Sequence, residues 1–460
     1  MINPTTLFPD ATAELLQTLE DAPKTLMGVN SVIDFRDALK VDDPRYVETA
    51  KARADRFEKQ FFRTFGYDKI SSNFEPPQSG KHVLFFGHIG CGKSTELARL
   101  SRELHHPQRY WVVNVDLLAL LDPHNVNYCD VWLAVAQKLT QQLDQDGVKI
   151  ESIVLKRLEN WFTEQVLSNE QVKDFSAEIK AGAEVGSGIP LLGKLFASFT
   201  AAIKTGSTHR EILRTVVKNT YGEFINALNQ LFAAVVASIN AAGKGKQLLI
   251  VIDGADRFRQ DDWKKFFVDE GNQLTQASCV VVYTAPMALK SSGDRLDNFT
   301  SLVLPMVKLH EFDTDAKRPE AYKAMQQILL KRAHYSLFDD IATMDKLIDY
   351  SGGHLRDALR LLSYACIEAD VTPLTAAIID AAAKQLAADY RDRLETEEQY
   401  KLLVEIAADP ENDSRSAIIT KLVESGALLE YNSGSWRQPH PVVKLLHGYK
   451  KAALSRLSPP

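Results

Sequence analysis

The stretch Gly87-His-Ile-Gly-Cys-Gly-Lys-Ser94 has the residue types and the spacing needed to hold a phosphate group. Its glycines, Gly87, Gly90 and Gly92, allow backbone N–H groups to curl around an anion without interference from side chains. An apolar run at 83–86 precedes the stretch and predicts a strand, and a helix is expected after it. The positive end of that helix would point at the same anion. The pattern G-x-x-x-x-G-K-S, in this context, predicts a nucleotide phosphate loop.

Three side chains that follow the glycines have predicted roles at that phosphate site. Lys93 is expected to bridge the β- and γ-phosphates, and Ser94 to offer its hydroxyl to Mg²⁺. Thr95 is placed to reach the α-phosphate. ATP and Mg²⁺ are therefore the expected ligands.

A second acidic segment, "LLIVIDGADRF" at 248–258, is the expected partner of the phosphate loop. Five apolar residues predict a strand buried on both faces beside the loop, with Asp253 at its carboxyl end, where it can hold Mg²⁺ through water. Gly254 stands where many ATP-hydrolysing enzymes carry a glutamate. Asp256 is the predicted replacement, which would orient or polarise the attacking water. The alternative role of Asp256 is to cap the helix expected in "DRFRQDDWKKFF".

The elements that must position these residues alternate between strand and helix from Lys81 onward, which predicts an α/β fold with a parallel sheet. The fold class expected is a P-loop core with a helical insertion, a helical lid and a C-terminal winged helix. The predicted divisions are a helical lead-in at 1–78, the core at 79–310 with its insertion at about 128–243, the lid at 311–392, and the winged helix at 393–460. Within the lead-in, "DDPRYVETAKARADRFEKQFFRTF" is the clearest predicted helix.

Composition excludes several classes of protein. The 460 residues carry 54 basic and 60 acidic side chains, a net charge of −6, so no global positive field favours nucleic acid or anionic membrane. The four cysteines show no C-x-x-C pairing, which argues against a zinc site or a disulfide framework. The N-terminus lacks the pattern of a signal peptide, and a cytoplasmic location is expected.

Two apolar helices raise the question of membrane or partner contact. Residues 224–243 contain no charged residue, but their 3.6-residue periodicity favours a helix with one buried face over a membrane span. The apolar face formed by Leu192, Leu195, Phe196, Phe199 and Ile203 predicts a helix packed on the core, with a partner-binding or membrane-surface helix as the alternative.

The paired motifs, and "SGGHLRDALRLL" downstream, resemble the AAA+ and STAND group of P-loop ATPases, particularly the origin-recognition-like and NACHT-like branches. "IDGADR" is similar to the acidic motifs of NACHT and KAP proteins, and the resemblance implies a hydrolytic role for Asp256. It also implies that Thr284, at the end of "CVVVYT", is a polar sensor of the γ-phosphate. STAND proteins often carry an arginine just after this strand, and this chain has Ala285 and Pro286 instead.

The same resemblance makes Arg356 a lid arginine that reaches back to the nucleotide, and a guanidinium there can neutralise γ-phosphate charge. The alternative is a surface arginine with Arg360 as its neighbour one turn on. Such ATPases usually take a further arginine from an adjoining subunit, so a homo-oligomer is expected. The candidates for that arginine are Arg210, Arg214, Arg257, Arg259 and Arg295.

The C-terminal part reads as two helices and a β-hairpin, "ALLEYN" and "SWRQPHPVV" joined at Ser433 and Gly434, which is the outline of a winged helix. Eleven basic and 12 acidic residues between 371 and 460 make it a poor DNA binder by itself. A cluster of its basic side chains remains the alternative: Arg415, Lys421, Arg437 and Lys444. In STAND switches a histidine of this module touches the nucleotide, and His440 is the candidate here.

Two functions follow as expectations. The first is an ATP-hydrolysing molecular switch that couples nucleotide state to oligomerisation or to recruitment of a separate effector or sensor protein, in bacterial antiphage defence or signalling. The alternative is a DNA-engaging AAA+ loader of the initiator or transposition type. A nucleotide-binding scaffold with negligible turnover is a third, weaker reading.

Overall fold

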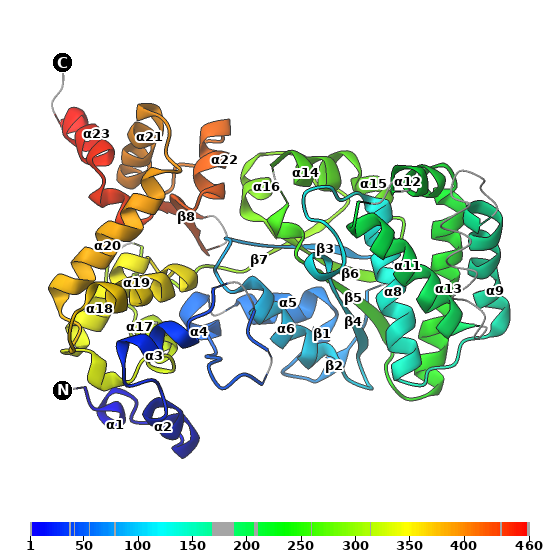
Figure 1. Cartoon of the computed structure of the whole chain (residues 1–460), viewed down its shortest axis with the longest axis horizontal. Helices are drawn as coiled ribbons and strands as arrows, with labels where there is room; N and C mark the ends of the chain where they lie inside the picture. Colours follow the sequence, from blue (N-terminus) through cyan, green and yellow to red (C-terminus); the bar gives the residue numbers. More distant parts are fainter. Residues whose placement is uncertain are drawn as a thin grey trace.

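The computed structural model shows an elongated molecule with the predicted sheet near its middle (Figure 1). The first part of the lead-in, the lid helices and the C-terminal helices lie at one end, and the helical insertion lies at the other. The structure describes residues 2–35, 38–40, 42–54, 56–77, 80–167, 188–206, 210–258, 260–312, 314–432 and 435–457.

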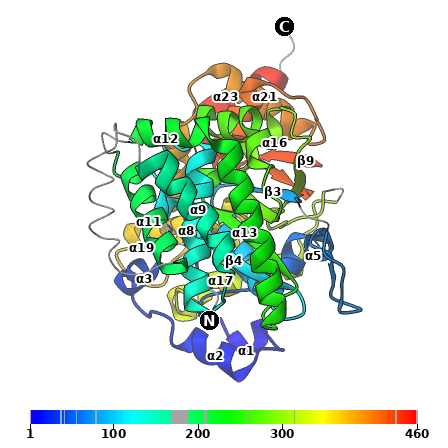
Figure 2. The same cartoon turned by 90° about the vertical axis from the view of Figure 1, so that its right-hand side faces the viewer.

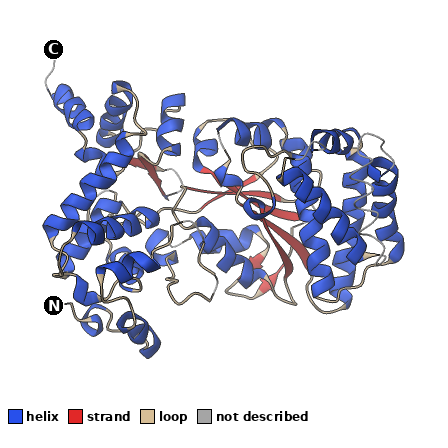
Figure 3. Cartoon of the chain, in the orientation of Figure 1, coloured by secondary structure: helices blue, strands red, loops and turns tan. Residues whose placement is uncertain are grey.

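The central sheet has five parallel strands in the order β4-β5-β6-β3-β7 (Figure 3). They are β3 (His82–Gly87), β4 (Tyr110–Asp116), β5 (Gln247–Asp253), β6 (Val280–Pro286) and β7 (Thr300–Val303). The middle strands are runs of buried β-branched and aromatic residues, as strands covered on both faces require. The predicted α/β class with a parallel sheet is confirmed.

One detail of the predicted sheet is wrong. The acidic strand β5 does not lie beside the phosphate-loop strand β3, because β6 lies between them. The register sets Phe85 of β3 opposite Thr284 of β6, and Ile252 of β5 opposite Tyr283. All three strands run in one direction, so their carboxyl ends still meet at one edge of the sheet.

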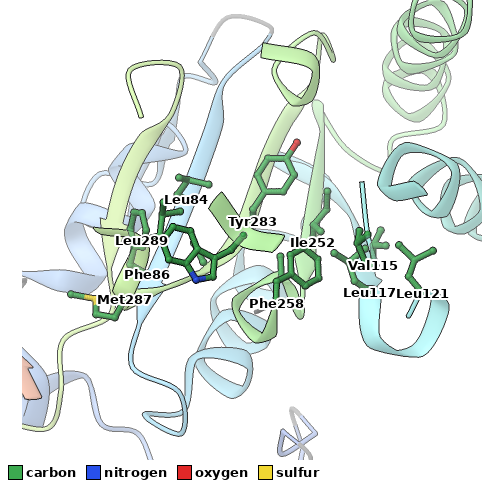
Figure 4. Close-up of a cluster of buried hydrophobic side chains, with 14 of the residues drawn as sticks. Leu84, Phe86, Val115, Leu117, Leu121, Ile252, Phe258, Tyr283, Met287 and Leu289 are labelled. Atoms are coloured by element: carbon green, nitrogen blue, oxygen red, sulfur yellow. The ribbon is translucent and has the colours of Figure 1, made fainter. Parts of the chain in front are cut away.

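Side chains alternate between the two faces of the sheet. One face carries Leu84, Val115, Ile252 and Tyr283, which pack with Phe258, Met287 and Leu289 in the larger core (Figure 4). The other face, which includes Phe85, packs against Phe57 and other aromatic residues of the lead-in and against helix α6 (Lys93–Leu104). Short helices follow the strands: α7 (Leu117–Leu120), η3 (Ala255–Arg257), α14 (Gln260–Lys264), η4 (Lys265–Asp269), α15 (Gly271–Leu274) and α16 (Met287–Ser291).

The predicted helical insertion packs against β4 and β5 and faces the viewer in Figure 2. Its elements are α8 (Tyr128–Gln145), α9 (Ser152–Trp161), η1 (Phe162–Leu167), α11 (Ile189–Lys204), α12 (Arg210–Asn219) and α13 (Tyr221–Ala241). The apolar face of α11 is buried against α8, so the alternative of a partner-binding or membrane-surface helix is wrong.

One helix in the described part of the chain, α13, is long and apolar enough to cross a membrane by length and composition. Its apolar stripe, which includes Phe224, Leu228, Leu231 and Val235, is buried in the core of the protein. That burial agrees with the prediction of a helix with one buried face.

The lead-in is less helical than predicted. Its helices are α1 (Pro4–Leu7), α2 (Ala13–Glu20), α3 (Leu26–Val32), α4 (Ala50–Arg53) and α5 (Phe57–Thr64), followed by the two-residue strands β1 (Tyr67–Asp68) and β2 (Asn73–Phe74). The segment predicted as one long helix is irregular at 42–49 and divides into α4 and α5. Side chains of this irregular segment line a pocket, so tertiary contacts override its helical pattern.

The lid and the C-terminal part complete the chain. The lid comprises α17 (Pro319–Leu330), η5 (Tyr335–Leu337), α18 (Ile341–Ser351), α19 (Leu355–Glu368) and α20 (Ala376–Arg391). Residues 393–460, called the C-terminal module below, contain α21 (Glu397–Ala408), α22 (Ala417–Glu424), β8 (Leu428–Tyr431), β9 (Trp436–Pro439), η7 (Pro441–Leu445) and α23 (His447–Leu457). The two helices and the antiparallel hairpin appear as predicted, while Ser433 and Gly434 lie outside the described residues.

Candidate functional site

The glycine-rich loop joins β3 to α6 and is closely covered by the lid. Gly90 and Gly92 have φ angles of +91° and +92°, which a residue with a side chain rarely adopts. A Cβ atom on Gly90 would lie 2.8 Å from Cβ of Arg356 and 2.8 Å from Cε1 of His354. A Cβ atom on Gly87 would lie 2.9 Å from Cγ of Lys93. The loop is therefore a bare backbone cradle, as phosphate binding requires.

Lys93 is buried in this cradle as half of an ion pair. Its Nζ lies 2.8 Å from Oδ2 of Asp256 and donates to the carbonyl oxygens of Gly87 at 2.8 Å and His88 at 3.1 Å. Burial alone would lower the pKa of Lys93 and raise that of Asp256. Because each charge stabilises the other, the pKa of Lys93 is instead raised and the pKa of Asp256 is lowered. The Asp256 carboxylate is thus directed at Lys93. In this conformation the carboxylate occupies the place at the ammonium that a phosphate oxygen would take.

Asp253 ends β5 among hydroxyl groups. Burial and the charge of Asp256 raise the pKa of Asp253, while hydrogen bonds from the hydroxyls of Ser94 and Thr284 oppose that rise. The Gly254 N–H lies 2.8 Å from Oδ1 of Asp253 and 2.9 Å from Oγ1 of Thr284. A carboxylate and a serine hydroxyl in contact are ligands that suit Mg²⁺, which keeps several waters and is otherwise bound by substrate phosphates. Among the described residues no group of three or more His, Cys, Asp or Glu side chains forms an all-protein metal cage.

The glycine after Asp253 is required by the backbone. Gly254 has a φ of +96°, and a Cβ atom there would lie 2.9 Å from Cγ of Leu118 in α7. A glutamate at this position would combine backbone strain with a collision. Among the described residues, the buried carboxylates that line the pocket beside the loop are those of Asp256 and Glu96.

The pocket over the loop contains about 990 Å³ of empty space, part of it open to solvent. Gly90, Gly92, Lys93, Ser94 and Thr95 form its floor, so the structure gathers these predicted residues around one space. Apolar side chains of the lead-in and the lid form another wall of the pocket. That wall comprises Phe35, Ala38, Leu39, Val47, Ile328, Leu355 and Leu359. A pocket lined by both a phosphate loop and apolar side chains suits a molecule that has phosphates and a flat base.

The lead-in closes this pocket through contacts that the sequence did not indicate. The Leu39 N–H donates to Oγ1 of Thr95 at 3.1 Å, so the threonine expected at the α-phosphate holds the lead-in here. Arg53 is buried and donates to the carbonyl oxygens of Cys91 at 2.7 Å and Pro305 at 2.5 Å. It fixes the phosphate loop from a position 38 residues earlier in the chain. No local motif marks Arg53, and a single arginine in a helix gives no signal of such a role.

Arg356 lies at the start of α19 and lines the pocket. Its backbone N–H donates to the carbonyl oxygen of Gly90 at 3.1 Å. Burial and the nearby Arg257 lower the pKa of Arg356, and its side chain has no ion pair with any residue that the structure describes. Arg360, by contrast, lies 3.1 Å from Asp357 and also pairs with Asp389. The two neighbouring arginines therefore have different environments, and Arg356 faces the site.

His440 does not reach the pocket, so the prediction that it touches the nucleotide is wrong for this conformation. The side chain is fully buried and stacks on Tyr390 with ring centroids 4.7 Å apart. Its Nε2 lies 3.2 Å from Oδ2 of Asp357, although no hydrogen bond of good geometry forms. The same carboxylate accepts from the Tyr390 hydroxyl at 2.6 Å and lies 3.1 Å from Nδ1 of His354. His354 in turn donates from Nε2 to the carbonyl oxygen of Ile89 at 2.8 Å.

A second contact joins the phosphate loop directly to the C-terminal module. The backbone N–H of Glu430, in β8, donates to Nε2 of His88 at 3.0 Å. Burial, and then the neighbouring His354, Lys93 and His440, lower the pKa of His88 to about 3, so the ring is neutral and its Nε2 can accept. The Glu430 carboxylate binds Nε of Arg437 at 2.8 Å and the Ser291 hydroxyl at 3.1 Å. Arg437 is therefore buried in an ion pair, and its predicted place in a basic DNA-binding cluster is wrong.

The arginines predicted to complete the site of an adjoining subunit lie in different environments. Nη2 of Arg214 lies 2.5 Å from Oδ2 of Asp130, and both side chains are buried. Arg214 therefore cannot reach the site of a neighbouring subunit, and the prediction is wrong for this residue. Arg210 lies in the insertion and pairs with Glu211, Arg257 lines the pocket of its own chain, and Arg295 is exposed. Arg259 lies outside the described residues.

No protein-family model and no curated protein matches the chain. Solved structures do resemble it. A Walker-type ATPase of Pyrococcus abyssi is 10% identical, with a TM-score of 0.40 over 90% of this chain and 98% of that one. The ORC2 protein of Aeropyrum pernix, in complexes with ADPNP and ADP, is 11% identical, with a TM-score of 0.34 over 93% and 98%. Cdc6p of Pyrobaculum aerophilum is 12% identical, with a TM-score of 0.31 over 94% and 98%.

Proposed function

We propose that the chain binds ATP over the phosphate loop and hydrolyses it to ADP and phosphate. One observation carries this proposal: the buried Lys93–Asp256 pair lies in a glycine cradle, next to the Ser94–Asp253 contact. A lysine held at the end of a backbone nest is suited to phosphate, and the carboxylate beside it is suited to water.

The residues act in sequence. When phosphate oxygens replace Asp256 at Lys93, the carboxylate is released from its ion pair and becomes a general base for water near the γ-phosphate. Ser94 and Asp253 would hold Mg²⁺, which supplies charge neutralisation for the leaving and transferred phosphates. Arg356 contributes a further positive charge from the lid, and Thr284 fixes the end of β5 through the Gly254 N–H. Positioning and charge do most of the work in such a reaction.

We further propose that the ATPase is a switch read by the C-terminal module. His88 belongs to the phosphate loop, yet its ring holds β8, and α22 packs on α16 of the core. A shift of the loop upon nucleotide binding would change the acceptor for the Glu430 N–H, so nucleotide state and docking of the module are linked. Recruitment of an effector or sensor protein, homo-oligomerisation and a role in bacterial defence or signalling are the wider form of this proposal.

A DNA-engaging loader is the second candidate, and one observation keeps it open. Arg415, Lys421 and Lys444 are exposed on the C-terminal module. The near-neutral charge of the module and the burial of Arg437 oppose it.

The experiment compares purified wild type with Lys93→Ala for release of phosphate from ATP, with Mg²⁺ and with EDTA. Hydrolysis by wild type in Mg²⁺ alone is expected, with no turnover by the variant. Hydrogen exchange at β8, with ADP and with a non-hydrolysable ATP analogue, then tests the switch. Equal exchange in both states would refute it. A strong increase in turnover with added duplex DNA would favour the loader.

A further inference from the structure

A second cavity lies behind the phosphate loop, between the lid and the C-terminal module. It holds about 690 Å³ of empty space, part of it open to solvent. Its lining comes from all three parts of the protein and comprises His88, Ile89, His354, Arg356, Asp357, Arg360, Tyr390, Arg393, Val423, Glu424, Ser425 and Gly426. The nucleotide pocket shares only Ile89 and Arg356 with it.

The charges in this cavity favour an anion. Three guanidiniums line it against two carboxylates, those of Asp357 and Glu424. The Asp357 carboxylate is occupied by Tyr390, His354 and Arg360, so it is not available to the other arginines.

Two of the arginines keep donors for a ligand. Neither Arg356 nor Arg393 forms a side-chain ion pair with any residue in the described ranges. Arg393 donates from one nitrogen to the Ser425 carbonyl oxygen at 3.0 Å and lies over the Tyr390 ring at 4.9 Å. Its remaining N–H donors form no hydrogen bond with any residue that the structure describes, and a guanidinium fork of this kind matches phosphate oxygens.

We infer that this second cavity binds a small phosphate-bearing molecule, held by Arg393 and Arg356. Such a ligand would bridge the lid to the segment that begins the C-terminal module and would stabilise the docked arrangement. Because Arg356 also lines the nucleotide pocket, an anion in one space competes with an anion in the other for the same guanidinium. The coupling is reciprocal: each ligand weakens the other. The regulatory part of this inference rests on the proposed function, and the binding itself does not.

The test uses inorganic pyrophosphate and isothermal titration calorimetry without Mg²⁺. The full chain carries Lys93→Ala, which removes the phosphate loop as a competing anion site. Addition of Arg393→Ala is expected to weaken pyrophosphate binding about tenfold or more, the effect of losing a charge-assisted hydrogen bond. Arg393→Lys, which keeps the charge and loses the fork, should give an intermediate affinity. The matched control is Arg391→Ala, since Arg391 is exposed, pairs with Asp392 and lies outside the lining.

The outcomes separate the two proposals. No binding to Lys93→Ala protein, or binding that Arg393→Ala leaves unchanged, overturns the second site. An equal loss of pyrophosphate affinity with Arg391→Ala also overturns the second site, because the loss would then come from general surface charge. If pyrophosphate binding depends on Arg393 but the wild-type protein does not hydrolyse ATP, the second site stands and only the proposed function is refuted. In an active wild type, pyrophosphate at fixed free Mg²⁺ should raise the Kd for an ATP analogue, and Arg393→Ala should reduce that rise to the part caused by pyrophosphate at the phosphate loop itself.

Discussion

Asp256→Asn is the perturbation that most directly examines the site. In the free protein Asp256 neutralises Lys93, and both side chains are almost fully buried, at 7% and 3% exposure. Removal of one partner of a buried pair typically costs about 3–5 kcal/mol, because a charge stays buried without compensation. We expect the lower end, about 3 kcal/mol, since Lys93 still donates to two carbonyl oxygens and the asparagine Oδ1 can accept.

That cost applies only when no phosphate occupies the loop. With nucleotide bound, phosphate oxygens solvate Lys93 in both proteins. The variant is therefore destabilised only in its free state, and its free energy of nucleotide binding should become more favourable by the same amount. A difference of about 3 kcal/mol corresponds to roughly a hundredfold lower Kd. Hydrolysis should move in the other direction and fall by about a hundredfold or more, because a general base is lost.

The assays are titration calorimetry with a non-hydrolysable ATP analogue and phosphate release from ATP. Asp116→Asn is the matched control. Asp116 ends the neighbouring strand opposite Asp253, and its Oδ1 caps α7, which asparagine does equally well. If Asp256→Asn binds the analogue no more tightly than wild type, Lys93 is not paired with Asp256 in the free protein. Hydrolysis at the wild-type rate would show that another group activates the water.

Further predictions concern the loop and its contacts. Lys93→Ala should abolish ATP binding in calorimetry, and retained affinity would mean that the glycine cradle alone suffices. Gly254→Glu should not raise turnover and should lower the midpoint of urea unfolding, since left-handed strain costs about 1–3 kcal/mol and Leu118 lies within 2.9 Å of the new Cβ; a faster enzyme would contradict this. The pKa of His88 falls from 6.5 in the unfolded chain to about 3 in the fold, so its contribution to stability is present above pH 6.5 and is lost as the pH falls toward 3. His88→Gln, whose amide oxygen can still accept from Glu430, should lose less unfolding free energy than wild type between pH 7 and pH 4, and equal losses would exclude His88 as the titrating group.

The phosphate loop and the acidic strand were predictable because their chemistry is local. Glycine spacing, a lysine and a hydroxyl in consecutive positions fix what a backbone nest can bind, whatever surrounds it. The buried strands were equally clear, since continuous runs of β-branched residues suit a parallel sheet covered on both faces. The role of Asp256 in place of a glutamate stays a prediction from spacing, and the structure places its carboxylate 2.8 Å from Nζ of Lys93.

The order of the strands, the wall of the pocket and the partners of buried charges were decided by tertiary structure. β6 lies between β3 and β5, which no local pattern specifies, because sheet order depends on where each crossover helix packs. Arg53 and His88 hold groups 38 and 342 positions away in the chain. His440 was placed by burial against Asp357 rather than by its motif. A sequence shows which side chains can carry charge, but only the packed protein decides which of those charges meet and which remain available to a ligand.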